Sequence, residues 1–339
     1  MSARRNAIFL PPRLRGLSLI ELMIAMTLGL LLLSGLILVY LESRRQALLE
    51  AEGARLQQSG RYALSLLQHE LTMAGFFGGW PEPGLLAADA GAPGCGGLAG
   101  WALAPEPALD LIADIQGEAR RSVHGHDLGC LPTGSGAIAQ ATDVLVIKRS
   151  AAQATLENGA FAAGISAAEA SQWYLRIGHG GAAWRYVGEG ENFPAVDRAP
   201  ASGVSYWEVY ASIFFIRPWS QPGDGVPTLC VERLSANSVG PVECLVDGVE
   251  DLQLSIGIDS NGDGSAERFT DNPDAVELQR ARTARVALLL RSLAPVPGHR
   301  RSLEEGDGGG LDQDGYLRRW FSGTVNLHNL NLPQPVQTL

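Results

Sequence analysis

Several features that are common in enzymes and nucleic-acid-binding proteins are missing from this sequence of 339 residues. It contains no G-x-S-x-G, no H-E-x-x-H and no phosphate-binding loop, so no catalytic motif predicts an enzyme. The net charge is −10, so direct nucleic-acid binding is not expected. Proline is missing between Arg13 and Pro81, which permits one uninterrupted helix there.

Charge is almost missing between Leu17 and Leu41, where Glu21 is the single charged residue. About 20 apolar residues cross a bilayer as a helix, so residues 17–41 predict a transmembrane span. Residues 1–16 carry four arginines and no acid, which predicts a cytoplasmic leader and an external remainder. A cleaved secretory signal is the alternative, but no convincing A-x-A site follows the span.

The pattern continues as an amphipathic segment over residues 42–75, and together the two predict one helix of about 55 to 60 residues. Residues 76–136 are rich in Gly, Pro and Ala, which predicts a long loop with short helical pieces. Runs of β-branched and aromatic residues then predict strands. The predicted strands are residues 142–149, 172–178, 182–188, 206–218, 227–234, 249–259, 283–292 and 323–330.

The expected fold class is therefore α+β, with the long helix packed on an antiparallel β-rich head over residues 76–339. The run "VALLLR" (residues 286–291) is apolar at successive positions. Such a run predicts a central strand covered on both faces, one of them by the long helix.

The stretch "RGLSLIELMIAM" (residues 15–26) resembles the signal of type IV prepilins and pseudopilins, a basic leader ending in glycine before an apolar helix. The resemblance implies cleavage after Gly16 by the prepilin peptidase and N-methylation of Leu17, where most family members carry phenylalanine. Glu21 would then be the fifth mature residue. Its carboxylate would pair with the Leu17 amine, in the same chain or in a neighbouring subunit. A snorkelling glutamate in a plain membrane anchor is the alternative.

Two further segments, "VEDLQLSIGIDSNGDG" (residues 249–264) and "TVNLHNLNL" (residues 324–332), resemble the PilW group of minor pilins, with His328 in place of an arginine. The resemblance implies a pilin-like fold and a role in initiating type IV pilus assembly within a tip or priming complex. The implied partners are other minor pilins, the major pilin, the prepilin peptidase, the inner-membrane assembly platform and a large tip adhesin.

The same resemblance implies a single pass through the inner membrane, with the head in the periplasm before the protein enters the pilus at the cell surface. A type II secretion pseudopilin of the J class shares this organisation and is the alternative. A membrane-tethered periplasmic sensor or enzyme is a second alternative, although no converging set of acid, base and nucleophile supports it.

Four cysteines, Cys95, Cys130, Cys230 and Cys244, follow the apolar segment and would face an oxidising compartment. An even number allows two disulfides in three connectivities, or free buried thiols. We expect Cys95 to pair with Cys130 and Cys230 with Cys244, since each pair flanks a single loop. No C-x-x-C occurs, so zinc ligation by cysteine is not expected.

Asp259, Asn261 and Asp263, followed by Gly264, match the first half of a calcium-binding loop. The twelfth position of such a loop would be Thr270 rather than glutamate, and Glu267 or Asp271 would substitute only in a different geometry. Calcium is therefore the single candidate cofactor, and a solvated turn between two strands is the alternative.

Two histidines lie close together in "RSVHGHDLGC" (residues 121–130). His124 and His126 form either a weak metal-binding pair or part of a polar loop.

Overall fold

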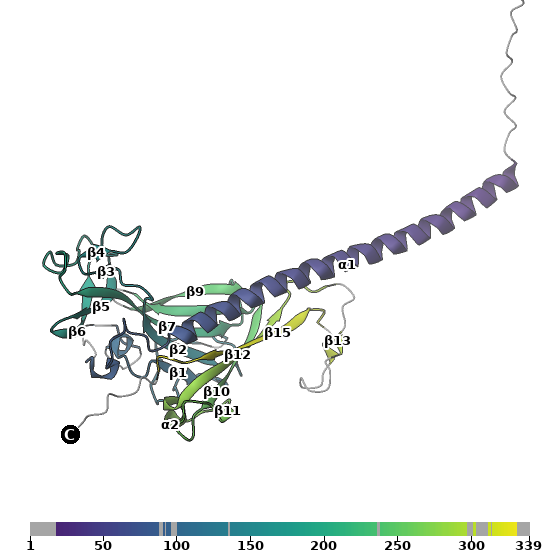
Figure 1. The fold of residues 1–339 in the computed structure, drawn as a ribbon. Coiled ribbons are helices and arrows are strands. Elements are labelled where there is room, and N and C mark those ends of the chain that lie inside the picture. Colours follow the sequence, from purple (N-terminus) through teal and green to yellow (C-terminus); the bar gives the residue numbers. More distant parts are fainter. Residues whose placement is uncertain are drawn as a thin grey trace, which may run out of the picture. The chain divides into compact units, whose positions relative to one another are not determined.

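The computed structural model describes residues 18–87, 91, 93–95, 100–134, 136–235, 238–296, 301–302, 311–312 and 314–330 (Figure 1). Gly16 and Leu17, the expected cleavage site, lie outside these residues. The chain divides into two compact units, Met1–Ala51 and Glu52–Leu339.

Helix α1 (Leu19–Met73) has 55 residues, within the expected length (Figure 1). Its start is closed by a reciprocal pair of hydrogen bonds, the capping box. The Glu21 amide donates to Ser18 Oγ, and the Ser18 amide donates to Glu21 Oε2, each at 3.2 Å. Among the described residues, α1 is the one helix long and apolar enough to cross a membrane. Its apolar residues from Leu19 to Leu41 are exposed, as lipid-facing residues would be.

The part of α1 that belongs to the second unit packs into the main core of the head. Leu56, Ala63, Leu67 and Leu71 are buried there at helical spacing. Burying one such leucine stabilises the fold by roughly 1.5–3 kcal/mol. The head also binds this segment by charge, since Arg149 donates two hydrogen bonds to the buried Glu70, at 2.7 and 2.8 Å. Both carboxylate oxygens of Glu70 accept a hydrogen bond from Arg149. Such hydrogen bonds offset the cost of removing a charge pair from water.

The larger sheet has nine antiparallel strands arranged around β7 (Ser205–Arg217). The C-terminal half of β7 pairs with β2 and β8, and its N-terminal half pairs with β3 and β5. The other strands are β1 (Leu109–Ile112), β2 (Val144–Ser150), β3 (Leu156–Glu157), β4 (Ala160–Phe161), β5 (Gln172–Gly178), β6 (Gly181–Val187), β8 (Thr228–Leu234) and β9 (Val239–Asp247).

A smaller antiparallel sheet has the order β11-β10-β12-β15, and its inner face joins the core beneath α1. A separate two-stranded ladder and three short helical segments complete the described elements. The bounds are β10 (Val249–Ile258), β11 (Arg268–Thr270), β12 (Ala281–Arg291), β15 (Arg318–Asn326), β13 (Arg301–Ser302), β14 (Leu311–Asp312), η1 (Pro83–Leu85), η2 (Trp101–Leu103) and α2 (Ala275–Gln279).

The α+β class is confirmed, but three local expectations were wrong. Strand β1 lies inside the region expected to be loop, where its four buried residues form too short a run to stand out from the surrounding prolines. Strand β12 is central, yet only one face is fully buried, and Arg285 on the other face is exposed. Strand β15 spans Arg318–Asn326 rather than residues 323–330, because its ladder with β12 runs from Arg318 opposite Arg291 to Asn326 opposite Thr283.

Candidate assembly and ligand sites

Glu21, the candidate assembly residue, is exposed on the first turn of α1. One of its carboxylate oxygens accepts the Ser18 amide, so the side chain has a local role that the sequence alone did not reveal. Within the described part of the chain, Oε1 accepts no hydrogen bond. A carboxylate at a helix start also interacts favourably with the exposed amides there. The pairing of Glu21 with the Leu17 amine stays a prediction, because Leu17 is not described.

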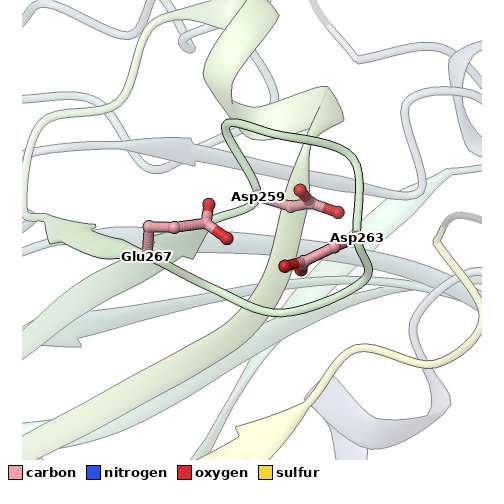
Figure 2. A group of neighbouring side chains, drawn as sticks. All are labelled: Asp259, Asp263 and Glu267. Atoms are coloured by element: carbon pink, nitrogen blue, oxygen red, sulfur yellow. The ribbon is translucent and has the colours of Figure 1, made fainter.

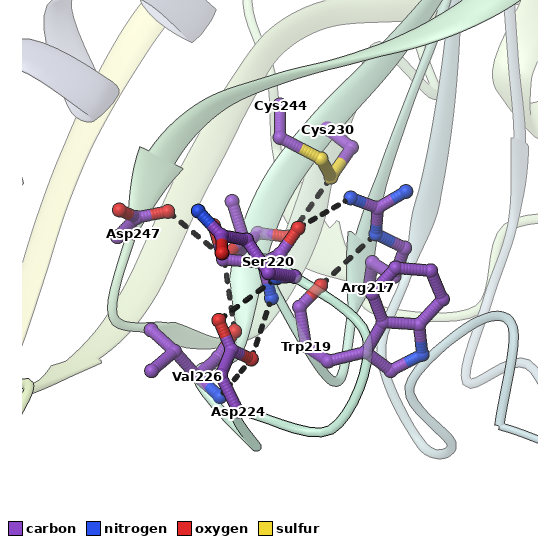
Figure 3. The surroundings of a disulfide bond; sticks show 10 residues. Arg217, Trp219, Ser220, Asp224, Val226, Cys230, Cys244 and Asp247 are labelled. Atoms are coloured by element: carbon purple, nitrogen blue, oxygen red, sulfur yellow. Dashed lines mark hydrogen bonds between the residues drawn. A yellow bond between two sulfur atoms is a disulfide. The ribbon is translucent and has the colours of Figure 1, made fainter.

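The structure contains two disulfides, and they join the cysteines in the expected pairs. Cys95 bonds Cys130 with Cα atoms 4.7 Å apart, and Cys230 bonds Cys244 with Cα atoms 4.0 Å apart. The second bond links the paired strands β8 and β9 (Figure 3). Near it, the Asp224 carboxylate closes the loop that follows β7, where it accepts three backbone amide hydrogen bonds.

The acidic turn after β10 gathers three carboxylates, those of Asp259, Asp263 and Glu267, whose ligand atoms lie within 4.8 Å of one another (Figure 2). Asp259 is buried, and its Oδ2 accepts the Gly264 amide at 2.9 Å and Arg282 Nε at 3.0 Å. Burial acts to raise the pKa of Asp259, but its hydrogen bonds from Arg282 and the backbone outweigh this and hold the pKa below its usual value.

The donor set of this turn suits calcium only in part. Carboxylate oxygens are the ligands that Ca²⁺ prefers. However, Arg282 already balances the charge of Asp259, and the Asn261 amide group donates to Asp263. Asp271 bonds Ser255 instead of joining the group. The turn is thus held together by its own chain, and calcium binding stays a prediction.

His124 and His126 meet at a residue that the sequence analysis missed, the buried Asp110 on β1. His124 Nδ1 lies 3.1 Å from Asp110 Oδ1, and His126 Nδ1 lies 3.2 Å from Oδ2. Ser122 Oγ donates to the same carboxylate at 2.5 Å. Burial acts to raise the pKa of Asp110, but the hydrogen bonds from His124 and Ser122 outweigh it and hold this pKa below its usual value. Asp110 was missed because its strand was interpreted as loop.

The one lysine of the chain is a second buried group that the sequence did not single out. Lys148 Nζ donates to the Ala104 carbonyl at 2.9 Å and lies 4.6 Å from the centre of the Trp101 ring. Burial lowers the pKa of Lys148 to about 7. These contacts satisfy the amine, so Lys148 is a structural residue of the β1–β2 region.

Together, the long apolar N-terminal helix and the antiparallel head define a pilin-like α+β protein. Residues 12–37 match the family model of the prokaryotic N-terminal methylation motif. Residues 213–329 match PilW, the type IV pilus-assembly protein W family, and this confirms the predicted resemblance. These matches support a pilin role, and the matched family is structural rather than enzymatic.

None of the curated proteins matches this sequence. Among solved structures, a type IV-like pilin from Thermus thermophilus aligns with 81% of this chain and 97% of its own length, at 13% identity and a TM-score of 0.34.

Proposed function

We propose that this chain is a minor pilin of the type IV pilus, which helps to initiate pilus assembly within a tip or priming complex of minor pilins. The observation that carries the proposal is the coincidence of two family matches in one chain. A methylation motif surrounds Glu21, and a PilW match covers much of the head. A protein that is only anchored to the membrane would need neither the methylation motif nor a PilW-like head.

The proposed mechanism is assembly rather than catalysis. The helix segment at residues 17–41 would hold the precursor in the inner membrane with the head in the periplasm. Cleavage after Gly16 would free an amine on Leu17, and that amine would approach the Glu21 carboxylate of a neighbouring subunit. A charge inside a bilayer is costly unless it is paired, so this contact favours one register between adjacent helices.

The proposed partners follow from this mechanism. The prepilin peptidase would process the chain, and the inner-membrane platform would extract it from the membrane. Other minor pilins and the major pilin would bind its helix, and a large tip adhesin would bind the complex at the cell surface.

The proposal is tested by deletion of this chain in its native host. We expect the loss of surface pili, restoration by the intact chain, and recovery of other minor pilins when the intact chain is purified from membranes. Normal pili together with a block in protein secretion would instead identify a pseudopilin. Normal pili and normal secretion would identify a membrane-tethered protein of another kind.

A further inference from the structure

A compact polar cluster outside the assembly helix has no role in the proposed function. Asp110 is 2% exposed, and each of its carboxylate oxygens contacts one histidine. His124 Nδ1 contacts Oδ1, and His126 Nδ1 contacts Oδ2. The Leu111 amide and Ser122 Oγ also donate to this carboxylate. Both oxygens of the Asp110 carboxylate are therefore occupied by hydrogen bonds.

The hydrogen bonds to Asp110 fix how the two imidazole rings are presented. An ionised carboxylate only accepts hydrogen bonds, so each histidine must place its proton on Nδ1. The opposite ring nitrogen, Nε2, then carries the lone pair and faces away from Asp110. A histidine that binds a metal ion through Nε2 is commonly oriented by a carboxylate on Nδ1 in this way.

The backbone brings the two rings to one side of a tight turn. The Ser122 amide donates to the His126 carbonyl at 2.8 Å, and the Gly125 amide donates to the Ser122 carbonyl at 2.8 Å. Gly125 has a φ of +79°, which a residue with a side chain rarely adopts. The two rings are nearly parallel, with an interplanar angle of 21° and centroids 6.4 Å apart. His124 lines a cavity of about 500 Å³, and the His124 and His126 side chains are 12% and 28% exposed.

We propose that His124 and His126 bind one divalent transition-metal ion of the zinc class through their Nε2 atoms, with Asp110 as the positioning residue for both rings. Zinc–nitrogen bonds are about 2.1 Å long, so the two Nε2 atoms must lie within about 4 Å of each other in the bound state. Ring centroids 6.4 Å apart are compatible with that spacing, and water would complete the coordination.

The chemistry separates this site from the acidic turn at Asp259. Neutral imidazole suits Zn²⁺, Cu²⁺ and Ni²⁺, whereas a set of carboxylate oxygens suits Ca²⁺ and Mg²⁺. The cysteines do not compete for zinc, because all four are joined in disulfides.

The test is calorimetric titration of Zn²⁺ into the full chain in detergent, purified with a tag that contains neither histidine nor cysteine. We expect one zinc ion per chain. His124→Gln and His126→Gln should each weaken binding at least tenfold, while His69→Gln, at an exposed histidine on α1, should leave it unchanged. Asp110→Asn should weaken binding on the order of 10- to 100-fold although both rings remain, as is typical when a group that orients a ligand is lost.

Two further measurements separate a metal site from a merely structural cluster. Co²⁺ should give a visible absorption band in the wild type that His126→Gln removes, with far-ultraviolet circular dichroism unchanged. Asp263→Asn should leave zinc binding intact, since it alters only the acidic turn. If no zinc binds, or if the double variant of His124 and His126 binds as well as the wild type, the proposal is wrong and the two rings serve only to satisfy Asp110.

Discussion

Replacement of Glu21 separates two roles that this side chain has at the start of α1. As part of the capping box, Glu21 accepts the Ser18 amide, a contact worth roughly 0.5–2 kcal/mol to a helix start. As an assembly residue it would supply a charge to the Leu17 amine of a neighbour. Loss of one partner from a fully buried charge pair costs about 3–5 kcal/mol, and less near lipid headgroups.

Three variants distinguish these roles. Glu21→Ala removes the cap and the charge. Glu21→Gln keeps an acceptor that functions in a capping box but removes the charge. Ser18→Ala removes the other half of the cap and keeps the charge. All three chains should still insert and fold, because removal of a charge or a hydroxyl from the span makes insertion easier.

The assay is recovery of partner minor pilins on purification, together with a count of surface pili. If the charge pair governs assembly, both Glu21 variants should lose partners, by about tenfold for each 1.4 kcal/mol. Ser18→Ala should resemble the wild type. Normal recovery and normal pili with Glu21→Gln would refute the pairing and leave Glu21 as a helix cap.

Four other outcomes are expected. Expression with the prepilin peptidase should give a mature chain that begins at Leu17, and an N-terminus after residue 41 would indicate an ordinary secretory signal. Peptide mapping without reductant should recover the two disulfides in the pairs described, each worth on the order of 3–4 kcal/mol, and any crossed pair would contradict the structure. If the acidic turn binds calcium, titration with Ca²⁺ should give a signal that Asp263→Asn removes, and identical traces would exclude that site. Burial raises the pKa of Glu232, on β8, from 4.5 to about 7, so the folded chain retains a proton that the unfolded chain loses in this window. Glu232 should therefore lower stability by on the order of 3 kcal/mol as the pH rises from about 4.5 to 7. In urea unfolding, Glu232→Gln should remove this share of the slope, whereas the exposed Glu243→Gln should not.

The parts of the fold that were predictable from sequence have strong local patterns. Helix α1 has an uninterrupted apolar and then amphipathic run, and β5, β7 and β10 have dense β-branched and aromatic residues between turn residues. The short β1 has no such signal, because four residues are too few to establish a period. Its position depends on pairing with β2, which is a tertiary contact.

The candidate sites show the same contrast between local sequence motifs, which were predictable, and tertiary contacts, which were not. Glu21 and the acidic turn are contiguous motifs, so the sequence places their residues together. The cluster at Asp110 is not contiguous, since β1 brings Asp110 against a turn that begins 12 residues later. The histidines were visible as a pair, but the carboxylate that orients them depended on a strand that the sequence did not reveal. The partner of Asp259, Arg282, was missed because it lies 23 residues away in the sequence, at the start of β12.

The matched PilW segment supplies much of the core beneath α1. This core draws on Phe214 and Ile216 of β7 and on the inner faces of β8, β10 and β12, which lie within residues 213–329, and β1 and β2 add further residues from outside that segment. A different cluster, formed by Leu156, Tyr174, Val187, Phe193, Val204 and Tyr206, lies wholly outside that segment. Residues that share no packing partners contribute nearly independently to stability. A chain that keeps the core beneath α1 can therefore vary the β3–β6 layer without altering how its helix is held, so this layer is where we expect differences in head partners between such proteins to arise.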